Sequence, residues 1–84
     1  MTMLDKVIEQ YPEESFLKAD GYDDAVIGVD EKSMRLIYSN RKYIEILMQR
    51  DGMDEEEAID YFYYNTVNAF VGKKTPIWCE DVYL

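Results

Sequence analysis

Two runs of β-favouring residues, joined by a short polar segment, constrain the fold of this chain more than any other feature. The runs are 25–29 (AVIGV) and 34–38 (MRLIY), and the four residues between them are all polar. Such a short connection predicts a β-hairpin, because a few residues can join only antiparallel neighbours. Gly28 inside the first run predicts a bulge or a close backbone approach. Alternate residues of the second run would share one face of the sheet: Met34, Leu36 and Tyr38.

Two amphipathic segments on either side of the hairpin predict helices. The first covers about residues 2–10 and has Thr2 as its cap. The second runs to about Arg50, with Ser39 or Asn40 as its cap and its apolar residues three and four positions apart. Gly52 supplies its C-terminal stop, since glycine readily adopts the left-handed conformation that ends many helices.

A third helix opens at Asp54, in the most acidic part of the chain. Asp54 and Glu57 have the spacing of a capping box, and the three glutamates of this turn sit where the helix dipole favours negative charge. The acidic run therefore has a complete structural explanation. We expect Gly72 to end this helix. Its inward-facing stripe would consist of Ala58, Ile59, Phe62, Thr66, Ala69 and Phe70.

Residues 75–79 (TPIWC) predict a third strand, and Pro76 places its start at a sheet edge or at the first position of the strand. The predicted order is α-β-β-α-α-β. We therefore expect residues 1–84 to form a single small α+β domain, with a three-stranded, mainly antiparallel sheet packed against helices. A chain of 84 residues is long enough for one domain and no more.

The charge balance restricts the partners that the chain can attract. Eighteen acidic residues against nine basic ones give a formal net charge of −9. This charge disfavours direct binding to DNA, RNA or an anionic membrane, each of which attracts a basic surface. Two interpretations remain. The acidity serves solubility alone, or it serves a basic partner, such as a nucleic-acid-binding protein whose groove the acidic surface occupies.

The N-terminal dozen residues have neither the basic start nor the unbroken apolar stretch of a signal peptide, and no stretch approaches transmembrane length. Cys79 is the one cysteine, so the chain cannot form an intramolecular disulfide. These features predict a cytoplasmic protein.

The residue types argue against an enzyme. The chain has no histidine, which removes serine–histidine and cysteine–histidine catalysis and histidine-bound zinc. Cys79 is followed by Glu80 and Asp81 instead of an activating cation, so we expect an inert strand residue. The sequence therefore predicts no catalytic residue, no cofactor and no metal.

Two weaker patterns have simpler explanations. The segment 72–75 (GKKT) is similar to the end of a phosphate-binding loop, but the leading glycine of that motif is missing and a helix precedes the loop instead of following it. A turn between helix and strand explains it. Asp20, Asp23, Asp24 and Asp30 lack the alternation of a calcium loop, and ordinary turn chemistry explains the Asp-Gly pair that begins at Asp20.

The outward face of the third helix is the candidate contact surface. It combines carboxylates with tyrosines, and tyrosine often supplies the anchor of a protein interface. The alternative is a solvated helix whose tyrosines lean over the edge of the core. Lys73 and Lys74 form a basic spot, which the predicted helix end explains because cations are favourable there. The candidate protein-interaction residues are Glu56, Glu57, Asp60, Tyr61 and Tyr64.

Several short pieces occur in order along the chain: DAVIGV at 24–29, RDGM at 50–53, Glu57-Ala58, Tyr61-Phe62, Asn65, Ala69, Val71-Gly72 and TPI at 75–77. Through these pieces, the stretch from Ala25 to Trp78 resembles a family of small, uncharacterised bacteriophage and prophage proteins. The chain departs from the family pattern at Asn68, where glycine is usual, and at Lys73, where an acidic residue is. The family carries no assigned activity or catalytic residue, so the resemblance implies only a phage setting and the cytoplasm of a host cell.

Three hypotheses follow for the function. The first is a non-enzymatic acidic binding protein that inhibits a host defence protein, such as an anti-CRISPR or a DNA-mimicking blocker of a nuclease. The second is a small structural or assembly protein that self-associates, as a homodimer for example, through an edge strand near Ile77 and Trp78. The third is a module for a small ligand or nucleotide, built from residues 72–75 and nearby tyrosines.

Overall fold

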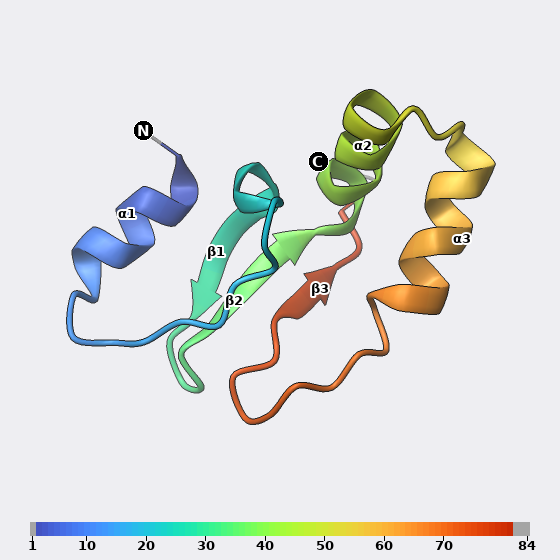
Figure 1. The fold of residues 1–84 in the computed structure, drawn as a ribbon. Coiled ribbons are helices and arrows are strands. Elements are labelled where there is room, and N and C mark those ends of the chain that lie inside the picture. Colours follow the sequence, from blue (N-terminus) through green and yellow to red (C-terminus); the bar gives the residue numbers. More distant parts are fainter. Residues whose placement is uncertain (1, 82–84) are drawn as a thin grey trace.

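The computed structural model of the chain describes residues 2–81 and confirms the predicted α+β class and element order (Figure 1). A short 3-10 turn, Asp23–Ala25, precedes the first strand. Each predicted helix and strand is present, with shifts of one or two residues at most ends. The elements are α1 (Met3–Gln10), β1 (Val26–Asp30), β2 (Arg35–Ser39), α2 (Asn40–Asp51), α3 (Glu55–Asn65) and β3 (Ile77–Cys79).

The predicted hairpin is formed by β1 and β2, which pair antiparallel. The register shifts between Val26 and Gly28, so the bulge expected at this glycine is confirmed. Leu36 and Tyr38 alternate along β2 and are both buried. The Tyr38 hydroxyl accepts a hydrogen bond from the backbone amide of Ala19 at 2.8 Å, which fastens the long segment between α1 and β1 to the sheet.

The third strand makes the sheet mixed, whereas the sequence predicted a mainly antiparallel one. The strand order is β1-β2-β3, and β3 runs parallel to β2, with Ile37 opposite Ile77 and Ser39 opposite Cys79. Adjacent parallel strands need a long crossover, and α2, α3 and the segment after α3 provide it (Figure 1). β3 is therefore an edge strand, as expected from Pro76 at its start.

Side-chain caps explain where the helices begin. Thr2 and Asp54 each form a complete capping box at the start of α1 and α3. The Ser39 hydroxyl accepts from the Lys42 amide at 3.0 Å and so caps α2. Gly52 ends α2 in the left-handed conformation, with φ of 72°, as the sequence predicted.

The third helix ends earlier than the sequence predicted. It stops at Asn65, and Gly72 lies in the later loop instead of at the helix end. Thr66 and Val67 are β-branched and have low helix propensity, and their amides both donate to the carbonyl of Phe62. The inward stripe therefore stops near this point. Phe70, expected inside, is 81% exposed.

An aromatic cluster fills the centre of the core. Phe62 is fully buried, and its ring centroid lies 5.3 Å from that of Tyr43 and 5.5 Å from that of Trp78. Both helices of the α2–α3 pair and the sheet therefore meet at this residue. The buried apolar residues are Leu4, Val7, Ala25, Val26, Leu36, Tyr38, Tyr43, Leu47, Ala58 and Phe62.

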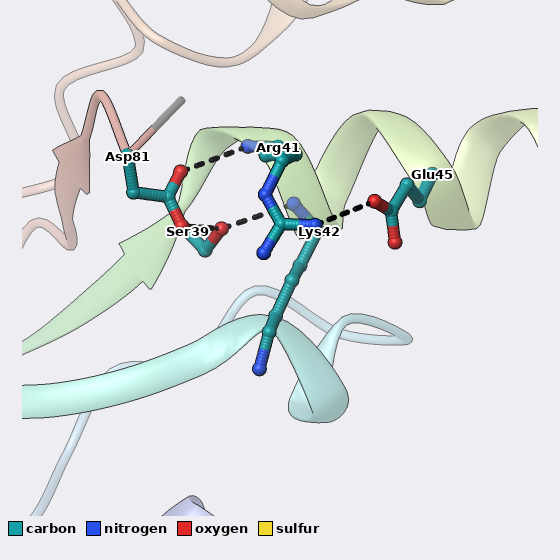
Figure 2. A network of polar contacts seen from close by, with 5 residues as sticks. All are labelled: Ser39, Arg41, Lys42, Glu45 and Asp81. Carbon is teal, nitrogen blue, oxygen red and sulfur yellow. Dashed lines mark hydrogen bonds and ion pairs between the residues drawn. The ribbon is translucent and has the colours of Figure 1, made fainter. Parts of the chain in front are cut away.

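Asp81, just after β3, joins the end of the sheet to the start of α2 (Figure 2). Asp81 is 3% exposed. It accepts a hydrogen bond from the Ser39 hydroxyl and another, of 3.2 Å, from the Arg41 amide. A negative charge at this end of α2 is also favoured by the helix dipole. One buried carboxylate thus links the cap of α2 to the last described strand.

The hairpin turn carries backbone strain at Met34, whose φ is 53°. Its amide donates to the Asp30 carbonyl at 2.7 Å, which holds the turn closed. The left-handed conformation costs a non-glycine residue about 1–2 kcal/mol. We expect Met34→Gly to raise the free energy of unfolding by about 0.5–1 kcal/mol and Met34→Val to lower it by about 1–2 kcal/mol, since a β-branched residue fits this region worst. Urea unfolding of the three proteins checks this ranking, and equal stabilities would contradict it.

Candidate functional site

The exposed surface of α3 carries a line of acidic and aromatic side chains. Ala58 and Phe62 point into the core, so the opposite side of the helix faces solvent. Glu56, Asp60 and Tyr64 are four residues apart and lie on that opposite side. All three are exposed, and Tyr64 is 88% exposed. We call these three residues the outer stripe.

The other two predicted interaction residues do not belong to the outer stripe. Glu57 takes part in the capping box, where its amide donates to the Asp54 carboxylate at 2.8 Å and its own carboxylate accepts from the Asp54 amide. Tyr61 is only 38% exposed and turns sideways to line a cavity next to α3. The helical spacing therefore identified the stripe but grouped two residues with it that have other contacts.

The acidic charge of the outer stripe has no nearby counter-charge in the sequence. Residues 51–72 contain six carboxylates and no lysine or arginine. Within residues 2–81 the ion pairs are Arg41 with Glu45, Arg50 with Asp51, and Lys74 with Glu14, so none of them involves α3. The stripe is therefore open to a cationic partner.

Beside α3 lies a cavity of about 330 Å³, which we call the aromatic pocket. Its walls come from the segment before β1, from α2, from the end of α3 and from β3. The rings of Tyr22 and Tyr43 stack with centroids 4.1 Å apart, and Trp78 meets Tyr43 edge-on at 5.2 Å. Arg50 fixes this wall, because its guanidinium lies 4.8 Å from the centroid of Tyr22 and donates to the Tyr22 hydroxyl at 2.9 Å. Tyr61, on α3, lines the pocket from that helix.

Polar groups at one end of the aromatic pocket form a small hydrogen-bonding set. The hydroxyls of Tyr43 and Thr66 lie 2.7 Å apart and share one hydrogen bond. Burial raises the pKa of Tyr43 well above its ordinary value, so the phenol stays neutral. Asn65 donates from its amide nitrogen to the Tyr61 carbonyl at 3.2 Å. The hydrogen bond between these two neutral hydroxyls uses only one of their two hydrogens, so the other hydrogen can be donated to a ligand.

The sequence did not identify the aromatic pocket. Tyr22, Tyr43 and Trp78 are far apart along the chain, and no local pattern connects them. The high tyrosine content, eight residues, was an indication of such a site, because tyrosine suits both the edge of a core and a binding surface.

The lysine pair is not explained by a helix end, which corrects the expectation from the sequence. Asn65 ends α3, well before Lys73. Lys74 pairs with Glu14 at 3.1 Å and donates to the Met34 carbonyl at 3.2 Å. The Thr75 hydroxyl closes the turn of residues 72–75 by donating to the Gly72 carbonyl at 2.6 Å. The segment is a closed turn that leads into β3.

The remaining candidate sites offer little chemistry. Cys79 is half-buried in β3. Among residues 2–81, no three cysteine, aspartate or glutamate side chains gather in an arrangement that could hold a metal ion. No helix in this part of the chain is long and apolar enough to cross a membrane.

Comparison with known proteins does not assign the chain to a family. No protein-family model, curated protein sequence or solved structure matches it.

Proposed function

We propose that the chain is a non-enzymatic binding protein that engages a basic protein through the outer stripe of α3. The observation that carries this proposal is the stripe itself: Glu56 and Asp60 have no cationic neighbour on α3, and the adjoining Tyr64 is 88% exposed. A tyrosine this exposed beside carboxylates is typical of an interface residue. A basic partner would supply the missing counter-charges.

The stripe is also well placed to bind with little loss of entropy. It lies on a helix that is fixed by a capping box at one end and by buried Ala58 and Phe62 along its inner side. A rigid helical surface loses little conformational freedom when a partner docks. Charge complementarity would speed the encounter, and Tyr64 would contribute the desolvated contact that slows dissociation.

The kind of basic partner that we propose is a host nucleic-acid-binding protein, such as a defence nuclease. The net charge of −9 and the resemblance to small phage proteins support this choice. A protein that occupies a nucleic-acid groove by charge alone should lose its partner as salt rises, because screening weakens contacts between exposed charges. An anti-CRISPR or another DNA-mimicking inhibitor would behave in this way.

The test compares affinity capture from host lysate by the wild type and by two charge-matched variants. We expect the double variant Glu56→Lys/Asp60→Lys to lose the partner. The control Glu9→Lys/Glu31→Lys makes the same charge change on exposed residues of α1 and of the hairpin turn, and we expect it to keep the partner. For the purified partner, Tyr64→Ala should weaken binding by about 2 kcal/mol, or roughly 30-fold by calorimetry.

Two outcomes would contradict the proposal. If both double variants lose the partner equally, the net charge attracts it and the stripe does not. If the wild type recovers only its own chain, the result favours self-association as the function instead of binding to a basic partner. The edge strand β3 favours that second function, because a hollow lined by Ile77 and the exposed Phe70 lies along it. Sedimentation velocity over a concentration series distinguishes a homodimer from a monomer.

A further inference from the structure

The aromatic pocket is separate from the outer stripe and has a chemistry of its own. It has a volume of about 330 Å³, within the range of small-molecule sites. Four aromatic side chains contribute to its lining: Tyr22, Tyr43, Tyr61 and Trp78. Walls of this kind favour a flat ring, because stacked and edge-on contacts between rings add to the gain from burial. Nothing in this site depends on a protein partner.

The polar end of the pocket suits the edge of a heteroaromatic ring. The Tyr43 and Thr66 hydroxyls can offer a donor and lone pairs, and the side-chain oxygen of Asn65 can accept. An amide and hydroxyls at the rim of an aromatic site are the groups that recognise ring nitrogens and exocyclic groups of a nucleobase. A purely apolar ring would leave these groups without a partner.

Two lysines lie in or next to the pocket, although the chain as a whole carries a net charge of −9. Lys18 lines the pocket directly. Lys73 lines an adjoining hollow that shares Leu17 and Val71 with the pocket. Within residues 2–81 neither Lys18 nor Lys73 forms an ion pair. Two unpaired lysines beside an aromatic cavity indicate a ligand that bears a negative charge next to its ring.

We infer that the aromatic pocket binds a planar heteroaromatic ring joined to an anionic group, the chemistry of a mononucleotide. The ring lies among Tyr43, Tyr61 and Trp78, its polar edge meets Asn65 and Thr66, and its phosphate meets Lys18 and Lys73. The site holds one nucleotide and does not extend along a strand, since the surrounding net charge repels a polyanion.

Trp78 makes the inference directly testable, because it is the only tryptophan and it lines the pocket. AMP, GMP, CMP and UMP are titrated into the wild type while Trp78 fluorescence is recorded, and heats are measured in parallel. We expect at least one of them to give a saturable change. Adenosine or the matching nucleoside should bind about tenfold more weakly, since the lysine contacts are lost, and inorganic phosphate should leave the fluorescence unchanged.

A charge-matched pair of variants separates the lysine site from general electrostatics. Lys18→Glu/Lys73→Glu should weaken the nucleotide about tenfold or more, whereas Lys6→Glu/Lys32→Glu, with the same charge change on exposed residues elsewhere, should not. Thr66→Val should also weaken it while circular dichroism stays unchanged. The inference is overturned if no mononucleotide gives a saturable change at 1 mM (roughly the upper limit of useful affinity), or if both lysine variants behave alike. The outcome of this titration does not depend on the outcome of the capture experiment on the outer stripe.

Discussion

Replacing Phe62 with alanine is expected to destabilise the chain more than any other substitution that we consider. Phe62 is fully buried, and its ring packs against both Tyr43 of α2 and Trp78 of β3. Such a truncation loses the burial of the ring and leaves a cavity, which together cost about 3–5 kcal/mol. A domain of this size has a total free energy of unfolding of about 4–13 kcal/mol. We therefore expect Phe62→Ala to unfold at far lower urea concentration or to be unfolded at room temperature.

The matched control is Phe70→Ala, which removes the same side chain from a position that is 81% exposed. We expect it to change the free energy of unfolding by less than about 0.5 kcal/mol. Urea titrations followed by circular dichroism measure both variants. A large loss for Phe70→Ala would mean that this residue is buried, as the longer helix predicted from the sequence required. A loss below about 1 kcal/mol for Phe62→Ala would contradict the aromatic core.

The sequence predicted most accurately those features that depend on neighbouring residues. Asp54, Ser39 and Gly52 mark the ends of helices through contacts made within four or five positions. The bulge at Gly28 and the hairpin turn are equally local. Each of these features is set by backbone conformation and short-range hydrogen bonds, so the residue types suffice to identify it.

Features that depend on contacts between distant residues were not predictable in this way. Thr66, the residue that follows α3, shares a hydrogen bond with Tyr43, 23 positions earlier, and helical periodicity does not reveal this contact. The parallel pairing of β3 depends on how α2 and α3 carry the chain back to the sheet. The bond between Ser39 and Asp81 spans 42 positions. In each case the sequence contains both residues or segments, but it does not show that they contact each other.

The two candidate sites differ in the same respect: one depends on local spacing and the other on contacts between distant residues. The outer stripe follows from helical spacing alone, so the sequence could identify Glu56, Asp60 and Tyr64. The sequence grouped Tyr61 with this surface, and the structure shows that Tyr61 is partly exposed and also lines the aromatic pocket. The aromatic pocket needs four separate segments to meet, and only the tertiary structure brings them together.

Replacing Asp81 with asparagine is expected to destabilise the chain by about 2–3 kcal/mol at pH 7, because hydrogen bonds to a charged acceptor contribute about 1.5–3 kcal/mol. Burial alone would raise the pKa of Asp81, but the hydrogen bonds from the Ser39 hydroxyl and the Arg41 amide outweigh it and hold the pKa below its ordinary value (Figure 2). Asparagine keeps the shape of the side chain but lacks its charge. Its NH₂ group would also face one of the two groups that donate to Asp81, so that two donors would oppose each other.

The pH dependence of this loss distinguishes a lost charge from a lost shape. Because the folded pKa lies below the unfolded value of about 3.9, the carboxylate stabilises the fold at neutral pH, and this stabilisation disappears as pH falls through the folded pKa. We therefore expect urea unfolding to show a full difference between wild type and Asp81→Asn at pH 7 that shrinks below about pH 4. Glu80→Gln, at the exposed neighbouring position, should leave stability within about 0.5 kcal/mol at both pH values. A difference that stays constant down to pH 3 (about one unit below the unfolded value) would show that Asp81 acts through packing instead of through its charge at the start of α2.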